Sequence, residues 1–350
     1  MSEIQATAGQ ALERAKANAE AVRRMTGAEP VLVDVQPAGQ AIPEMAPNVI
    51  LTSGPPLPWR DYYGGQRNAV IYGALYEGLA TDAEDADGLA PVLKDVIRAS
   101  GGIPLKPLIG RALRMGDELH SRNTAATTLF IRELTPQFLD YAATASTQRA
   151  LTALRFFFSS DYSFLRLSMA AAKAMADAAR DVAASSVVTA MTISCRNFAI
   201  RVSGLGDEWF TGPLPEVSCK LFEGFTDDDV QWIGGESHIT ETVGLGGFAQ
   251  AAAFGLQAYQ GGSAAEMVRM NSLMYEITVA EHPDFKIPYF GFRGSPVGID
   301  IFRVTGTGIT PVIDGGLAGK NGGQIGAGIL RAPVECFEAA TQAYRRTYRC

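Results

Sequence analysis

The sequence predicts a mixed α+β fold in which glycine-rich α/β units flank a helical middle subdomain. The chain has 350 residues, enough for two or three structural units. With 47% hydrophobic and 19% charged residues, its composition is typical of a globular protein. Its 37 glycines are densest in the last third, whereas none interrupts residues 123–183. We therefore expect an N-terminal α/β domain (1–100), a helical subdomain (101–184) and a C-terminal glycine-rich α/β domain (185–350).

The N-terminal unit follows an alternating helix and strand pattern. An alanine-rich helix must end before Pro30, and two short apolar runs resemble buried strands. The predicted elements are helix 3–25, strands 31–35 and 48–52, and helix 69–79. A stiff Gly-Pro loop over residues 51–59 carries Trp59, which either walls a pocket or lies in a plain connection.

The other two units differ in periodicity. Apolar residues recur at helical spacing in the middle unit, which predicts helices 109–134, 135–157 and 164–183, with turns near Thr135-Pro136 and residues 159–161. The C-terminal unit alternates again. Its predicted strands are 186–191, 198–202, 299–304 and 310–313, and its predicted helices are 248–259, 266–279 and 332–348.

Charge and cysteine usage narrow the functional class. The net charge is −7 and no Lys/Arg run stands out, so we expect no nucleic-acid partner. Residues 1–25 do not resemble a signal peptide, and no apolar stretch is long enough to cross a bilayer. The four cysteines show no paired spacing, which is typical of reduced thiols in a cytoplasmic protein.

The most distinctive segment is residues 236–248, where a polar run meets a glycine turn before a predicted helix. Glycines allow close approach of a ligand, and a helix start offers free N–H groups to an anion. The candidate substrate-binding residues here are Ser237, Thr240, Thr242, Gly244, Gly246 and Gly247. The alternative is a tight turn with hydroxyl caps.

A second polar segment covers residues 114–124. On a helix, Asp117, His120, Ser121 and Thr124 would share one face, so Asp117 could orient His120 as a catalytic base. A solvated helix face is the alternative.

Two further segments offer cations to an anionic ligand. Lys320 lies in the glycine-rich stretch 314–328, which matches neither nucleotide-binding glycine motif and is either an anion loop or a surface turn. Arg293 lies among turn residues, where it either forks onto a carboxylate with Asp300 orienting it, or forms a structural pair with Asp300. With three histidines and no ligand spacing, we expect no metal site and no cofactor.

Cys195 is a candidate nucleophile between two predicted strands. Arg196 would favour its thiolate, and His238 or His120 would act as base. The alternative is a buried, unreactive thiol. We add Glu241 to the catalytic candidates, and Asn123, Arg196 and Asn197 to the substrate-binding candidates.

Several of these segments, in order along most of the chain, resemble the family that includes the YlbE and YahG proteins and the AllG subunit of oxamate carbamoyltransferase. The matching stretches are 34–39, 51–56, 76–80, 115–123, 202–206, 239–247, 292–300 and 323–328. The resemblance implies carbamoyl transfer, in which oxalurate and phosphate are exchanged for oxamate and carbamoyl phosphate, within a multi-subunit setting.

The chain also departs from the family pattern. A block is missing between Ala80 and Met115, the Arg-Asn-Gly pattern near residues 191–197 is altered, and Gly319 stands where the family has a histidine. We therefore expect a divergent, shortened member.

The sequence is consistent with three functional hypotheses. The first is an enzyme that acts on the C–N bond of a small carbamoyl, ureido or amide carboxylate, by transfer to phosphate or by hydrolysis. The second is a partner-dependent, non-catalytic subunit, and the third is a small-molecule binding protein. We expect a homo-oligomer or an assembly with family partner subunits.

Overall fold

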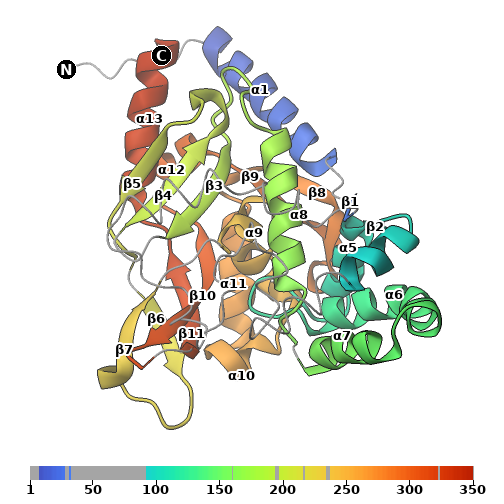
Figure 1. Cartoon of the computed structure of the whole chain (residues 1–350). Helices are drawn as coiled ribbons and strands as arrows, with labels where there is room; N and C mark the ends of the chain where they lie inside the picture. The colour runs from blue at the N-terminus through green and yellow to red at the C-terminus, as the bar shows by residue number, and fades with distance from the viewer. Residues whose placement is uncertain are drawn as a thin grey trace.

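The fold is α+β, with small antiparallel sheets surrounded by helices (Figure 1). The computed structural model describes residues 8–27, 31–32, 92–159, 161–193, 197–215, 217–233, 237–321 and 324–349. The predicted strand 48–52, helix 69–79 and loop 51–59 lie outside these residues. Among the described residues, no helix is both long and apolar enough to cross a bilayer.

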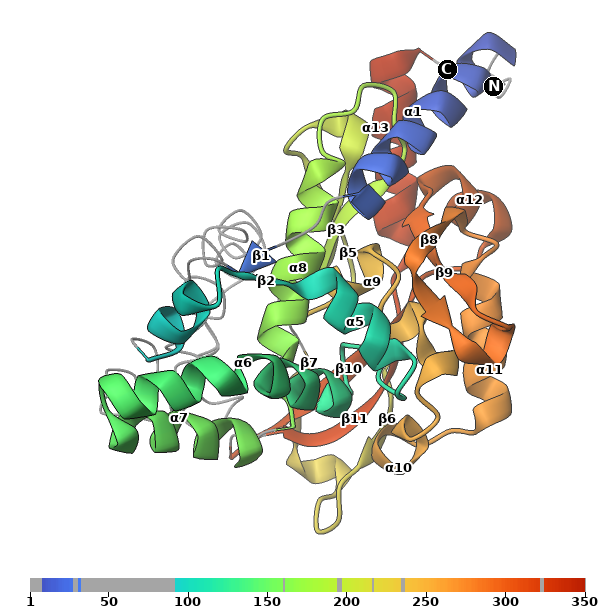
Figure 2. The same ribbon diagram turned by 90° about the vertical axis from the view of Figure 1, so that its right-hand side faces the viewer.

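The first half of the described chain is almost entirely helical. Residues 92–99 are helical, and the named helices are α1 (Ala8–Gly27), α5 (Leu105–Leu113), α6 (Thr124–Thr144), α7 (Thr147–Ser159) and α8 (Leu165–Ala178). Helices α6 and α7 lie side by side in both views (Figures 1 and 2). The predicted turn at Thr135-Pro136 is wrong, because Pro136 lies within α6. The buried side chains of Phe130, Leu134 and Phe138 keep that helix on the core despite the missing N–H group.

In the part of the chain that the structure describes, the strands form four separate antiparallel sheets. Their bounds are β1 (Val31–Leu32), β2 (Ile103–Pro104), β3 (Val188–Ile193), β4 (Phe198–Val202), β5 (Trp209–Gly212), β6 (Val217–Leu221), β7 (Val230–Ile233), β8 (Thr278–Ile287), β9 (Arg293–Ile299), β10 (Val312–Gly319) and β11 (Gln324–Arg331). The orders are β1-β2, β3-β4-β5, β6-β11-β10-β7 and β8-β9. The glycine-rich stretch 314–328 is therefore mostly two paired strands, and Gly315 lies opposite Gly328.

The remaining helices differ in part from the prediction. Helices α11 (Ala264–Met274) and α13 (Val334–Tyr348) lie where helices were expected, and so does the much shorter α10 (Leu256–Gln260). The predicted strand 299–304 is wrong after Ile299, because the Asp300 carboxylate accepts the N–H groups of Phe302 and Arg303 and caps α12 (Ile301–Thr307).

The glycine turn is likewise not followed by a continuous helix 248–259. The short helix α9 (Ile239–Thr242) precedes two 3₁₀ turns, at Gly246–Phe248 and Gln250–Ala252. The expected helix N-terminus facing an anion is therefore not formed there.

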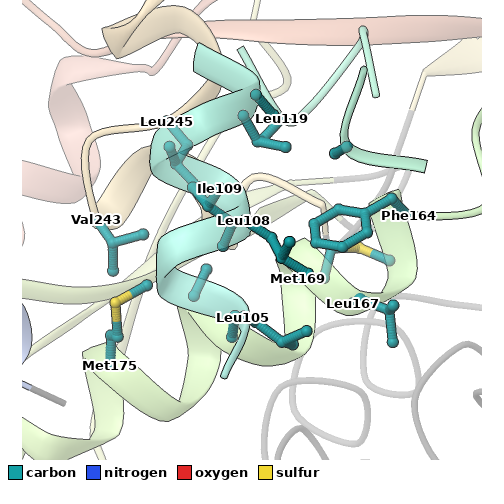
Figure 3. Close-up of a cluster of buried hydrophobic side chains, with 14 of the residues drawn as sticks. Leu105, Leu108, Ile109, Leu119, Phe164, Leu167, Met169, Met175, Val243 and Leu245 are labelled. Atoms are coloured by element: carbon teal, nitrogen blue, oxygen red, sulfur yellow. The ribbon is translucent and has the colours of Figure 1, made fainter. Parts of the chain in front are cut away.

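One buried apolar cluster supports both loops that carry the candidate site. Leu105, Leu108 and Ile109 of α5 pack with side chains of α8, and with Leu119, Val243 and Leu245 (Figure 3). Leu119 directly precedes His120, and the other two follow Glu241 closely. The cluster thus anchors two polar loops that are about 120 residues apart in the sequence.

Candidate functional site

The loop that carries His120 is folded around a buried carboxylate. Glu118 accepts the backbone N–H of His120 at 2.9 Å, and also the N–H groups of Ser121 and Arg122. Leu119, fully buried, takes a left-handed conformation with φ of 71°. Few residues other than glycine adopt that conformation, and it cannot be part of an α-helix. Residues 117–123 therefore form a tight turn rather than the predicted helix face.

His120 lies between a hydroxyl and a carboxylate. Its Nε2 lies 2.8 Å from the Oγ of Ser237, and its Nδ1 lies 2.7 Å from Oε1 of Glu241. We call these three residues the relay. A neighbouring carboxylate favours the proton on Nδ1, which leaves Nε2 free to accept the Ser237 hydroxyl proton. This is the arrangement of nucleophile, base and orienting acid found in several hydrolase classes.

The glycine turn holds Glu241 rather than an external anion. Oε1 also accepts the backbone N–H of Gly247 at 3.1 Å and of Asp314 at 3.2 Å, while Oε2 accepts the hydroxyl of Thr240 at 2.9 Å. The N–H groups of the other turn residues bond to backbone carbonyls. The predicted anion site formed by the N–H groups of residues 244–247 is therefore wrong, because those groups already have protein partners.

His120 and Glu241, which are both buried, shift each other's pKa. Burial alone would lower the pKa of His120, but the charge and hydrogen bond of Glu241 raise it above its ordinary value. Burial alone would raise the pKa of Glu241, but His120 and the surrounding donors hold it below its ordinary value. The pair therefore favours an ionised Glu241 beside a basic His120.

A second pair of carboxyl groups lies next to the relay. Burial, and after it the charge of Glu241, raises the pKa of Asp314 to about 6. Burial, and after it the charge of Asp314, raises the pKa of Glu118 well above its ordinary value. Gln250 donates to Oδ1 of Asp314 at 2.5 Å, whereas Oδ2 has no donor among the described residues. Both shifts favour the protonated, neutral form of these two carboxyl groups.

The predicted role of Asp117 is wrong, since Glu241 and not Asp117 orients His120. Oδ2 of Asp117 accepts the N–H of Ala126 at 2.8 Å, in the first turn of α6. Asn123 donates from Nδ2 to the His120 carbonyl at 2.8 Å, and its Oδ1 is buried without a donor among the described residues.

A small cavity of about 200 Å³ is lined in part by the residues that directly follow His120. Its lining residues come from three segments and are Ser121, Arg122, Asn123, Thr124, Asp161, Tyr162, Gly255, Leu256 and Tyr259. Nε of Arg122 donates to the Gly116 carbonyl at 3.1 Å. The two terminal nitrogens of Arg122 make no hydrogen bond to the described part of the chain. The Arg122 side chain is 40% exposed. Arg122 thus offers a two-nitrogen fork at the cavity.

Other predicted residues lie in or beside this region. His238 is buried with its ring centroid 5.7 Å from that of His120. The hydroxyl of Thr242 donates to the Ile239 carbonyl at 2.5 Å, and Gly244, at φ of 89°, passes closely over Ser295 and Pro296.

The remaining candidates are not joined to the relay. Arg293 is exposed, pairs with Glu281 at 2.6 Å rather than with Asp300, and covers the ring of Tyr275. Lys320 is exposed in the β10–β11 turn and donates to the Asp228 carbonyl at 2.5 Å. Asn197 is half-buried directly before β4.

Cys195 and Arg196 lie outside the described residues. Their predicted roles therefore stay predictions.

Sequence reasoning missed Glu118, Arg122, Gln250, Asp314 and Tyr259. Two of them stand in the same 115–123 segment that supplied His120, and Asp314 begins the late glycine-rich stretch. The contacts of Gln250, Asp314 and Tyr259 span more than 60 residues and leave no local pattern in the sequence. Within the described ranges, no group of three or more His, Cys, Asp or Glu side chains is arranged to hold a metal ion.

Comparisons with known proteins agree with this architecture. A family model described as oxamate carbamoyltransferase subunit AllG matches residues 59–237. The chain is 34% identical to the uncharacterized protein YahG of Escherichia coli (strain K12), over 95% of this chain and 86% of YahG. It is 33% identical to oxamate carbamoyltransferase subunit AllG of the same organism, over 94% of this chain and 97% of AllG.

A crystal structure of a conserved protein of unknown function from Enterococcus faecalis V583 superposes with a TM-score of 0.81 at 32% identity, covering 97% of this chain and 99% of that one. Each of the two sequence alignments spans 410 positions, more than the 350 residues here, so both relatives carry residues without a counterpart in this chain. Identity over nearly the whole length decides the assignment: the chain belongs to the family of AllG and YahG.

Proposed function

We propose that this protein is an enzyme acting on the C–N bond of a small carbamoyl, ureido or amide carboxylate, by carbamoyl transfer or by hydrolysis. The observation that carries the proposal is the relay, in which His120 is bonded to Ser237 on one side and to Glu241 on the other. Breaking such a bond requires a base that removes a proton from the attacking group and returns it to the leaving nitrogen. A histidine with one nitrogen held by a carboxylate is suited to both steps.

The cavity beside the relay supports a small substrate that carries an anion. The fork of Arg122 suits a carboxylate or phosphate, because two parallel N–H groups can bind two oxygens. Asn123 also lines the cavity, and its buried Oδ1 has no donor among the described residues. A volume of about 200 Å³ admits molecules of only a few heavy atoms.

Ligand binding is tested by thermal unfolding with oxamate, oxalurate, phosphate, carbamoyl phosphate and a panel of ureido acids. A ligand at a hundred times its dissociation constant stabilises the fold by about 2.7 kcal/mol. We expect Arg122→Ala to weaken binding of the carboxylate ligands by about tenfold or more, because a charged hydrogen bond is lost. Arg293→Ala, at an exposed arginine outside the cavity, is the matched control and should bind normally.

Turnover is tested with oxalurate and phosphate, with oxamate and carbamoyl phosphate, and with ureido acids in water. Product from any of these pairs, lost in His120→Gln, supports the proposal. Full activity in a folded His120→Gln protein contradicts it. Stabilisation by ligand without product in any assay also contradicts it, and favours a binding protein.

The second candidate is a subunit that needs a partner chain for turnover. It is favoured by the description of AllG as a subunit and by the residues that both relatives have and this chain lacks. Size-exclusion chromatography with and without proteins encoded nearby separates the two candidates. A partner-dependent subunit elutes earlier with its partner and turns substrate over only in that complex.

A further inference from the structure

We propose that Ser237 is the nucleophile of this site and carries the carbamoyl or acyl group covalently during the reaction. This inference rests on the proposed function, since it supplies the intermediate for the same C–N chemistry. It is an alternative to the thiol mechanism predicted for Cys195, which lies outside the described residues.

The position of the hydroxyl carries the argument. Ser237 precedes α9 and is half-buried, whereas His120 and Glu241 beyond it are buried. The order from the accessible end inward is therefore hydroxyl, imidazole, carboxylate, at 2.8 Å and 2.7 Å. A serine that served only to orient His120 would be redundant, because Glu241 already fixes the ring through Nδ1.

Both main-chain groups of His120 are also held in place. Its N–H donates to Glu118 at 2.9 Å, and its carbonyl accepts from Asn123 at 2.8 Å. The imidazole is thus fixed before any ligand arrives, so that Nε2 stays directed at the Ser237 hydroxyl. Such preorganisation is what an activated nucleophile requires.

The cysteines in the described ranges are poorly suited to the same role. Burial raises the pKa of the Cys219 thiol and of the Cys336 thiol to about 12, which disfavours the reactive thiolate. Neither lies in the relay, and Sγ of Cys336 contacts the Phe198 carbonyl.

The first step forms the bond between Oγ and the carbonyl carbon. The Ser237 proton moves to Nε2 of His120, and the carbonyl electron pair moves to its oxygen. When that pair returns, the C–N bond breaks and its electron pair stays on the leaving nitrogen. That nitrogen takes the proton from Nε2, which leaves the neutral imidazole and a carbamoyl ester on Ser237.

The second step releases the ester to an oxygen nucleophile, either water or inorganic phosphate. The proton of the nucleophile moves to Nε2 while its oxygen bonds to the carbamoyl carbon. The Oγ–C bond then breaks, and Oγ recovers a proton from His120. Carbamate or carbamoyl phosphate leaves, and the enzyme returns to its starting state.

The experiment uses cyanate, a carbamoyl donor small enough for the cavity. The Oγ of an activated serine adds to the carbon of cyanic acid, the protonated form of cyanate, and the hydroxyl proton moves to the nitrogen. The product is the same carbamoyl ester, formed without a leaving group. The protein is treated with cyanate, digested, and mapped by mass spectrometry to separate ester adducts from carbamoylated amines. We expect a modified peptide at Ser237 whose formation parallels loss of activity.

Variants establish what the adduct means. Ser237→Ala abolishes the ester adduct, whereas Ser272→Ala, an exposed serine on α11, leaves it unchanged. His120→Gln slows adduct formation by about 10² to 10⁴-fold. Thermal unfolding of each variant confirms that it is folded.

Three outcomes overturn the inference. An adduct on Cys195 with Ser237 unmodified restores the thiol mechanism, and modification of amines alone, in a preparation that turns over substrate, leaves no covalent serine step. A Ser237→Ala protein with full turnover has the same meaning. Failure of the proposed function is distinct, because there no substrate is turned over at all, whatever cyanate modifies.

Discussion

The carboxylate of Glu241 is the most highly coordinated side chain of the candidate site. It accepts from His120, Thr240 and two backbone N–H groups, and it is fully buried. In the proposed mechanism it touches no reacting atom. It acts through His120, by fixing the tautomer and stabilising the imidazolium that forms.

Glu241→Gln keeps the shape of the side chain and removes its charge. We expect kcat to fall by about 10³ to 10⁴-fold with little change in KM, because the base is weakened but the cavity is intact. Steady-state kinetics with the substrate found in the binding screen measure the two parameters. Glu276→Gln, at an exposed glutamate, should retain activity, and a loss seen only in KM would assign Glu241 to substrate binding instead.

Asp117 gives the stability of the fold a pH dependence. Burial raises its pKa from the ordinary 3.8 to about 6, although Ala126 and Arg122 oppose the shift. Between about pH 4 and pH 6, the folded chain holds a proton that the unfolded chain has released. The stabilising contribution of this group is therefore complete below about pH 4 and is lost as the pH rises through about 6.

Asp117→Asn removes that titration while keeping an oxygen that can accept the Ala126 N–H. The variant should lose less stability than the wild type between pH 4 and pH 7, by up to about 3 kcal/mol. Urea unfolding across this range measures the difference. Asp140→Asn, at an exposed aspartate on α6, should follow the wild type, and a parallel curve for Asp117→Asn would contradict the assignment.

At the scale of the element, the glycine turn after α9 has one position that no side chain can occupy without cost. A Cβ on Gly246 would lie 2.2 Å from Oε1 of Glu241, and its φ is 57°. Gly246→Ala should lower the free energy of unfolding by roughly 2 kcal/mol and also displace the carboxylate from His120. Chemical denaturation together with an activity assay measures both effects.

The matched control is Gly306→Ala in α12, where a Cβ meets nothing within 4 Å. An alanine there should leave activity unchanged and be neutral or slightly stabilising, since alanine favours a helix. Equal effects at the two glycines would show that Glu241 is not displaced.

Sequence periodicity predicted elements well where local signals and packing agree. The predicted strand 198–202 matches β4, and the predicted helix 332–348 begins two residues before α13. It failed where one local interaction overrides the pattern. A single capping carboxylate at Asp300 converts an apolar run into a helix, and pairing across a hairpin makes strands of a glycine-rich stretch.

The candidate site was predictable in its members but not in its connections. His120, Ser237 and Glu241 were each named from polar segments, yet Asp117 was paired with His120 because the two are neighbours on an assumed helix. The left-handed turn at Leu119 removes that helix, and the carboxylate comes from a residue 121 positions away. Such long-range contacts leave no periodic signal in a single sequence.

At the scale of the whole molecule, one buried polar network ties together three distant segments. Nδ2 of Asn18, on α1, donates to Asp300 at 2.6 Å, and its Oδ1 accepts the N–H of Ser186 at 2.8 Å. These segments are 168 and 282 residues from Asn18. Helix α1 is therefore an integral part of the fold, fastened next to the start of β3 and the cap of α12.

Asn18→Ala removes one donor from the buried Asp300 carboxylate and leaves the buried N–H of Ser186 without its acceptor. We expect the free energy of unfolding to fall by about 2 to 3 kcal/mol, without a change in the pH profile of activity. Thermal and urea unfolding measure the loss. Lys16→Ala, an exposed residue of the same helix, is the control, and an equally stable Asn18→Ala protein would show that the network contributes no net stability.

The relay also bears on the predicted division into units. His120 comes from the predicted middle unit, whereas Ser237 and Glu241 come from the predicted C-terminal unit. The division at residues 100 and 184 stays a prediction. In either case, the proposed chemistry needs both segments folded together.

The shared carboxylate of Glu241 has a consequence for hydrogen exchange. The amide protons of Gly247 and Asp314 point at one buried acceptor from two segments that are 67 positions apart, and both residues are fully buried. Neither proton can be released to solvent without disturbing the acceptor of the other. Their exchange with deuterium should therefore be slow and share one opening free energy, so that the interior of the site opens as a single cooperative unit.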